Sequence, residues 1–155
     1  MRRKVLVAFF SVSGRTEELA YQIADVLDAR LFEIKAINPY TAEDLDYNNM
    51  RSRVSIEMTT HNSRPDFIKR NLDMSEYDTI FLGFPIWWGM EPKIIDTFLE
   101  YYDLAGKTIF PFATSGGSDI IMAENSMKLV CPEADIRQGQ IISPMNAKRW
   151  ARSVM

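Results

Sequence analysis

Three short segments combine hydroxyl, glycine and aromatic residues in patterns that could bind a phosphorylated aromatic molecule. The first is Ser11-Val12-Ser13-Gly14-Arg15-Thr16. Its hydroxyl groups and backbone N–H groups could surround a phosphate at the positive end of a following helix. It lacks the Gly-Lys-Ser/Thr of a nucleoside triphosphate loop and the spacing of a GxGxxG turn. A capped helix start after a tight turn explains the same residues equally well.

The second segment, Pro85-Ile86-Trp87-Trp88-Gly89, contains two adjacent tryptophans. Consecutive side chains of extended backbone point in opposite directions, so both rings cannot enter one core. We therefore expect one ring beside a cleft, where a flat ligand could stack on it. Gly89 permits a positive φ angle there. The alternative is that both rings simply cover the top of the core.

The third segment is Thr114-Ser115-Gly116-Gly117, followed by Ser118. Its paired glycines would let the backbone approach a ligand closely. Taken alone, an ordinary strand-to-helix loop with Ser118 as the helix N-cap is the better interpretation.

The elements that must position these segments alternate between strand and helix. Continuous apolar runs predict buried strands, and apolar residues at i, i+4 and i+7 predict helices. The expected strands are 4–10, 30–35, 79–84, 107–113 and 135–142, and the expected helices are 17–29, 92–102, about 120–130 and 147–154. Residues 41–60 could form a polar helix, and residues 65–72 resemble a short helical turn.

This alternation predicts an α/β fold, with βαβ units, right-handed crossovers and a parallel sheet. We expect one domain over residues 1–155, a three-layer α/β/α sandwich around a five-stranded sheet. Ligands of such sheets bind beyond the carboxyl ends of the strands. The three segments follow the first, third and fourth strands, so together they would surround one crevice. Phosphate-binding groups would lie at one end of it, and an aromatic side chain could stack on a ring in the middle.

Bulk properties argue against several other classes of protein. The net charge is −3, which disfavours a nucleic-acid partner. Cys131 and His61 are single, so neither an internal disulfide nor a metal site is expected. Apolar runs are too short to span a membrane, and we expect a cytoplasmic protein. Cys131 is interpreted as a buried thiol and His61 as a surface side chain, while Glu91 and Asp119 are either cleft groups or solvated helix-start charges.

With these residues in view, the chain resembles a flavodoxin over nearly its whole length, and more closely the short flavodoxin-like proteins with a Pro-Ile-Trp-Trp-Gly loop. The family's phosphate loop, [Ser/Thr]-x-[Ser/Thr]-Gly-x-Thr, is matched by Ser11, Ser13, Gly14 and Thr16. The resemblance implies flavin mononucleotide (FMN) as the cofactor and the strand order 2-1-3-4-5. Where the family often has Asn, this chain has Arg15.

The same resemblance implies an aromatic stacked on the flavin after the third strand, with Trp87 the better match and Trp88 the second. It also implies that the loop from Thr114 holds the pyrimidine edge of the ring. Many flavodoxins place a Tyr in that loop, but no aromatic occurs between Ala113 and Ile121. One flavin face is therefore expected to be open to a partner or a small substrate.

The leading expectation is an FMN-binding electron-transfer protein that serves a redox partner protein. The alternative is an FMN-dependent NAD(P)H oxidoreductase that acts on quinone-like small acceptors. Because the flavin carries the redox chemistry, no residue of the chain is assigned a catalytic role. Small size and the lack of an obvious nicotinamide site favour the carrier, whereas the mild acidity favours the reductase.

Overall fold

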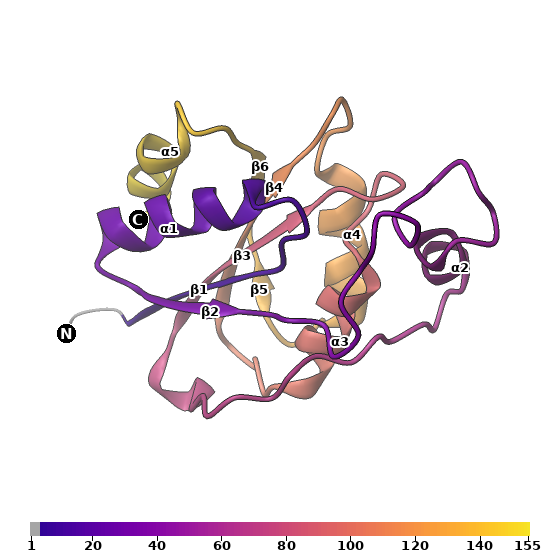
Figure 1. Ribbon diagram of the computed structural model, residues 1–155. Coiled ribbons are helices and arrows are strands. Elements are labelled where there is room, and N and C mark those ends of the chain that lie inside the picture. The colour runs from indigo at the N-terminus through magenta and orange to yellow at the C-terminus, as the bar shows by residue number, and fades with distance from the viewer. Residues whose placement is uncertain (1–3) are drawn as a thin grey trace.

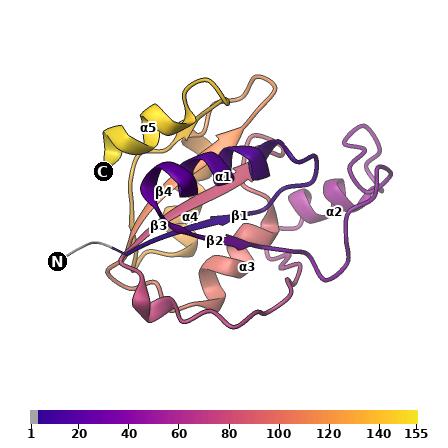
Figure 2. The ribbon, with the colours of Figure 1, turned by 60° about the vertical axis from the view of Figure 1, so that its left-hand side comes forward.

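The computed structural model describes residues 4–155, which form a parallel sheet covered by helices on both faces (Figures 1 and 2). The strand order is β2-β1-β3-β4-β5. Strand β6 follows β5 in the chain and pairs, like β5, with β4. The expected strand order and α/β class are confirmed. The strands are β1 Val5–Phe9, β2 Arg30–Glu33, β3 Thr79–Pro85, β4 Thr108–Thr114, β5 Asp135–Ile136 and β6 Gln140–Ile141.

Helices α1 and α5 cover one face of the sheet, and α3 and α4 cover the other (Figure 1). Short helices α2 and η1 lie in the long connection between β2 and β3. The bounds are α1 Arg15–Leu27, α2 Arg53–Thr59, η1 Met74–Glu76, α3 Lys93–Tyr101, α4 Ile121–Val130 and α5 Ala147–Val154. The predicted strands 4–10, 79–84 and 107–113 and the four predicted helices are thus confirmed, with ends that shift by up to two residues.

Two cores result from the alternation of side chains along the strands. Leu6 and Ala8 of β1 face α3 and α4, whereas Val7 and Phe9 face α1 and α5. Every residue of β1 is buried, as expected for a strand covered on both faces. Burying one such large apolar side chain stabilises the fold by about 1.5–3 kcal/mol. The layers therefore fix the carboxyl ends of β1, β3 and β4 side by side.

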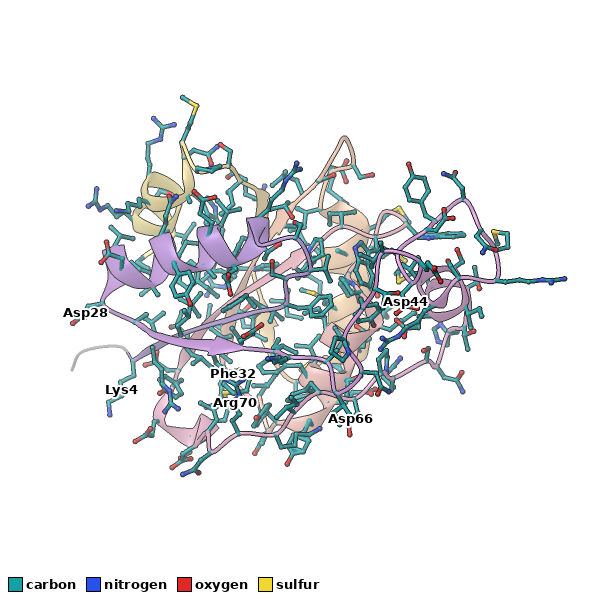
Figure 3. All side chains as sticks on the ribbon, viewed as in Figure 1. Lys4, Asp28, Phe32, Asp44, Asp66 and Arg70 are labelled. Carbon is teal, nitrogen blue, oxygen red and sulfur yellow. The ribbon has the colours of Figure 1, made fainter. Side chains whose placement is uncertain are left out.

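The predicted polar helix over residues 41–60 is wrong except for its last third, which is α2. Side chains before α2 bind nearby backbone N–H groups instead of leaving them to a helix. Thr41 N–H donates to Asp44 (3.0 Å), and Asn48 N–H donates to Asp46 (3.1 Å). Such local bonds compete with helix formation. Asp44, labelled at the right of Figure 3, lies in this turn-rich segment, and its carbonyl accepts a bond from Val54 N–H (2.8 Å).

The predicted helical turn over residues 65–72 is also wrong, because this segment is extended. Phe67 forms an antiparallel bridge with Ala36 and is fully buried. Its ring packs against Phe98 of α3, with ring centroids 6.0 Å apart. Burial of one large aromatic thus fixes the segment against the core, which a helical pattern search does not reveal.

The predicted strand over residues 135–142 is divided into β5 and β6. Ile109 and Ala113 of β4 accept hydrogen bonds from this side, from Arg137 and Ile142. Pro111 lies between them on the same strand edge and has no N–H to donate. Four residue steps, 136 to 140, oppose three on β4, 109 to 112, so the chain bulges around this proline.

Candidate functional site

The segment from Ser11 to Thr16 forms the connection from β1 to α1. Gly14 N–H donates to Ser11 Oγ (3.1 Å), and Arg15 N–H donates to Ser13 Oγ (3.5 Å). Gly14 has φ +88°, a conformation that L-residues rarely adopt. The loop therefore folds back over its own hydroxyl groups at the amino end of a 13-residue helix.

The amino end of α1 has donors that no side chain caps. Within residues 4–155, the backbone N–H groups of Thr16 and Glu17 make no hydrogen bond. Arg15 is exposed beside them. Free N–H groups at a positive helix end, with a guanidinium nearby, suit an anionic group such as a phosphate.

The two tryptophans have different surroundings. Trp87 and Met90 exchange two backbone hydrogen bonds of 2.9 Å, closing a tight turn. Its central residues Trp88 and Gly89 have φ 55° and 79°, the positive values of a type I′ turn. Positive φ was expected at Gly89 but not at Trp88, where a bulky side chain makes it a strained conformation.

The turn separates the rings, as expected for adjacent tryptophans. Trp87 is half-buried and packs edge-on against Phe10 (5.6 Å between centroids) and Tyr40 (5.3 Å). Trp88 is 42% exposed. Trp88 therefore presents the freer ring, whereas the family resemblance favours Trp87 as the stacking residue.

A cleft of about 780 Å³ lies between these loops. Its lining comes from the tryptophan turn, the loop after β4 and the β2–β3 connection: Ile86, Trp87, Trp88, Gly89, Ser115, Gly116, Gly117, Ser118, Leu45, Tyr47 and Val54. Leu45, Tyr47 and Val54 were not predicted from the sequence. Their only sequence signal is that they are apolar or aromatic residues within a polar stretch, because their place at the cleft is set by tertiary contacts.

The loop after β4 is held by one side chain. Ser115 Oγ accepts from Gly117 N–H (3.1 Å) and Ser118 N–H (2.8 Å). Ser118 was predicted to cap α4, but the helix begins at Ile121, whose N–H donates to Asp119 (3.1 Å). This prediction is wrong because α4 begins three residues after Ser118, where the Asp119 carboxylate accepts the bond from Ile121 N–H.

Contacts at the sheet edge bring the three loops together. Thr16 Oγ1 and Thr114 Oγ1 lie 3.1 Å apart, joining the start of α1 to the end of β4. Ile86 N–H donates to the Thr114 carbonyl (2.9 Å), joining the tryptophan turn to the same residue. Pro85 is paired with Thr114 as the last residue of β3. Figure 1 shows the three loops at one edge of the sheet, together with α2.

The structure does not place the first loop in the cleft itself. Ser11 and Val12 line a smaller hollow of about 170 Å³ with Phe10 and Tyr40. The cleft and the first loop are therefore neighbours connected through Thr16 and Thr114. A largely apolar cleft beside a helix end whose free N–H groups suit an anion fits a flat ring that carries a phosphate on a chain.

Two further candidate residues, Cys131 and His61, lie apart from the cleft lining. Cys131 is fully buried, which confirms the expected buried thiol, and burial raises its pKa to about 12. His61 is an exposed residue, as expected. Within residues 4–155, no group of three or more His, Cys, Asp and Glu could hold a metal ion. No helix in the same range is long and apolar enough to cross a membrane.

Comparison with known proteins agrees with this geometry. The model of the family described as flavodoxin matches residues 4–153. A candidate flavoprotein from Bacteroides uniformis is 41% identical, with a TM-score of 0.92, over 98% of this chain and 99% of its own. One from Bacteroides eggerthii is 37% identical, with a TM-score of 0.92, over 99% and 98%. A Lactobacillus acidophilus flavoprotein in complex with FMN is 21% identical, with a TM-score of 0.74, over 97% and 99%. No curated protein matches the chain.

Proposed function

This chain belongs to the flavodoxin family, and from that premise we propose that it binds FMN and transfers electrons through it. The observation that carries the proposal is the meeting of three loops at one sheet edge, through Thr16, Thr114 and Ile86. The expected cofactor agrees with the family and with the FMN complex of the Lactobacillus relative.

Each loop has a distinct task in this proposal. The free N–H groups of Thr16 and Glu17, with Arg15, bind the phosphate. The ring of Trp88 packs against the flavin, and backbone groups of Gly116 and Gly117 approach its edge. Bound FMN supplies the redox chemistry, and the protein holds and orients it.

An open cleft supports the carrier function. Trp88 and Tyr47, which line it from opposite connections, are 42% and 68% exposed. A ring held between such residues would lie near the protein surface, within reach of a partner. A redox partner protein is therefore the proposed recipient of the electrons.

The alternative is an FMN-dependent NAD(P)H oxidoreductase that acts on quinone-like small acceptors. Two observations favour it: the net charge is only −3, and the cleft is lined mostly by apolar and aromatic residues. A flat apolar acceptor could enter such a cleft beside the flavin.

An anaerobic reductive titration separates the two functions. Absorbance of the FMN-loaded protein is followed during addition of NADPH, and separately of dithionite. For the carrier we expect dithionite to bleach the flavin while NADPH alone leaves it oxidised. Rapid bleaching by NADPH, with steady NADPH oxidation when a quinone is added, would establish the reductase instead. A protein that takes up no FMN would overturn both.

A further inference from the structure

Two buried carboxyl groups lie directly behind the tryptophan turn. Glu91 follows Met90, the last residue of that turn, and is only 1% exposed. Its interpretation as a solvated helix-start charge is therefore wrong. Asp96, on the first turns of α3, is 2% exposed. Neither position is one where an unpaired charged carboxylate is stable.

Each of the two carboxyl groups has one buried oxygen, Glu91 Oε1 and Asp96 Oδ1, that finds no donor among the described residues. Each carboxyl is a hydrogen-bonding neighbour that affects the pKa of the other. The second oxygen of Glu91 accepts a bond from the Ser126 hydroxyl of α4 (2.7 Å). Two ionised carboxylates cannot hydrogen-bond to each other, but a protonated one can donate to an ionised one.

The surrounding charges are one cation short of balancing the three carboxylates here. Arg64 Nη1 lies 3.9 Å from Asp96, while its Nε donates to Glu100 (2.7 Å). Lys93 is buried and donates to the His61 carbonyl (3.3 Å). Glu91, Asp96 and Glu100 thus share two cations, Arg64 and Lys93. The carboxylate of Glu124 on α4 accepts instead from Gly139 N–H (3.1 Å).

We propose that Glu91 and Asp96 share one proton at neutral pH, and that this proton keeps the tryptophan turn fastened to α3 and α4 in the geometry that binds FMN. Glu91 connects covalently to the turn and through Ser126 to α4. A second negative charge in the pair would push Glu91 away from Asp96 and displace the turn. The part that concerns FMN rests on the proposed function, whereas the shared proton does not.

The direction of the pKa shifts agrees with this arrangement. Burial, followed by the contact with Asp96, raises the pKa of Glu91 to about 9, and burial raises the pKa of Asp96. The pKa of Glu91 in the folded protein lies above its ordinary value of 4.5. The protonated pair therefore contributes its full stabilisation to the fold below pH 4.5. It is lost as the pH rises toward 9.

The shared proton is tested in the apoprotein, without flavin. Infrared difference spectra across pH 6–10 report the C=O band of protonated carboxyl groups. We expect one such group at pH 7 in the native protein, lost near pH 9, and absent in Glu91→Gln. The exposed control Glu76→Gln keeps it. No protonated carboxyl at pH 7 in the native protein would overturn the proposal.

Removing a neighbouring charge gives an independent variant that does not touch the pair. Glu100→Gln leaves one carboxylate fewer beside the two cations, so the proton should be lost at lower pH than in the native protein. An unchanged midpoint would contradict the charge count. This variant also serves if Glu91→Gln does not fold.

The consequence for the site is tested by FMN titration at pH 7 and pH 9.5. We expect the native Kd to rise by up to about fourfold between these values, the limit set by loss of one proton with a pKa of about 9. In Glu91→Gln the Kd should be nearly constant, and in Glu76→Gln it should behave as in the native protein. A native Kd that does not change, although the carboxyl signal does, overturns the coupling. Absence of FMN binding in every protein at pH 7 would instead refute the proposed function.

Discussion

At the scale of single residues, the tip of the tryptophan turn holds Trp88 and Gly89 in a backbone conformation that destabilises the fold when an L-residue adopts it. Both have positive φ at the tip of the turn, 55° and 79°. The turn presents the exposed ring of Trp88 to the cleft while Trp87 stays packed on Phe10. Strain of this kind persists where the surrounding structure imposes it, here through the paired bonds of Trp87 and Met90.

Gly89→Ala tests this conformation. A Cβ at this position meets Met122 Sδ at 3.5 Å, an ordinary contact, so its cost comes from the backbone. We expect the free energy of unfolding of the apoprotein to fall by about 1–2 kcal/mol. Urea denaturation measures it, with Gly116→Ala as control, since a Cβ there has no neighbour within 4 Å. Equal effects of the two substitutions would contradict the account of the turn.

At the scale of elements, the break between β5 and β6 depends on a proline in the neighbouring strand. Pro111 has no N–H, and the opposing chain bulges with Gly139 close to it. A run of strand-forming residues, as over 135–142, predicts a strand but not the partner that faces it. The break is a tertiary effect, which explains why the sequence pattern missed it.

Gly139→Ala probes this close approach. A Cβ at this position would lie 2.4 Å from the Pro111 carbonyl oxygen, which is backbone and cannot move aside alone. We expect a loss of about 1–3 kcal/mol in the free energy of unfolding. The same denaturation measurement applies, again beside Gly116→Ala. A loss below half a kilocalorie per mole would mean that the bulge is looser than described.

At the scale of the whole molecule, the elements that the sequence predicts correctly are those with the most deeply buried side chains. The strands around Val7, Phe81 and Phe110 are buried on both faces, so their continuous apolar runs predicted them and the sheet. The loops at their carboxyl ends followed from that topology. Strong local signals and the global fold agreed in these parts.

The connection between β2 and β3 could not be predicted in this way. Its residues 41–52 are mostly polar, and turns built on Thr41, Asp44 and Asp46 replace the expected helix. Tyr47 reaches the cleft only because this connection stands beside the carboxyl edge of the sheet (Figure 1). The burial of Glu91 could not be predicted from the sequence either, because a charged residue before a proline suggests a solvated helix start. Long-range packing decides both cases.

Amide chemical-shift mapping by NMR with FMN, and then with riboflavin, tests most directly that three loops form one cofactor site. We predict that FMN shifts the amides of residues 11–16, 87–89 and 114–118 together. Riboflavin, which lacks the phosphate, should shift the last two groups and leave residues 11–16 nearly unchanged. If FMN leaves residues 11–16 unperturbed, or if its shifts centre on another surface, the account of the site is wrong.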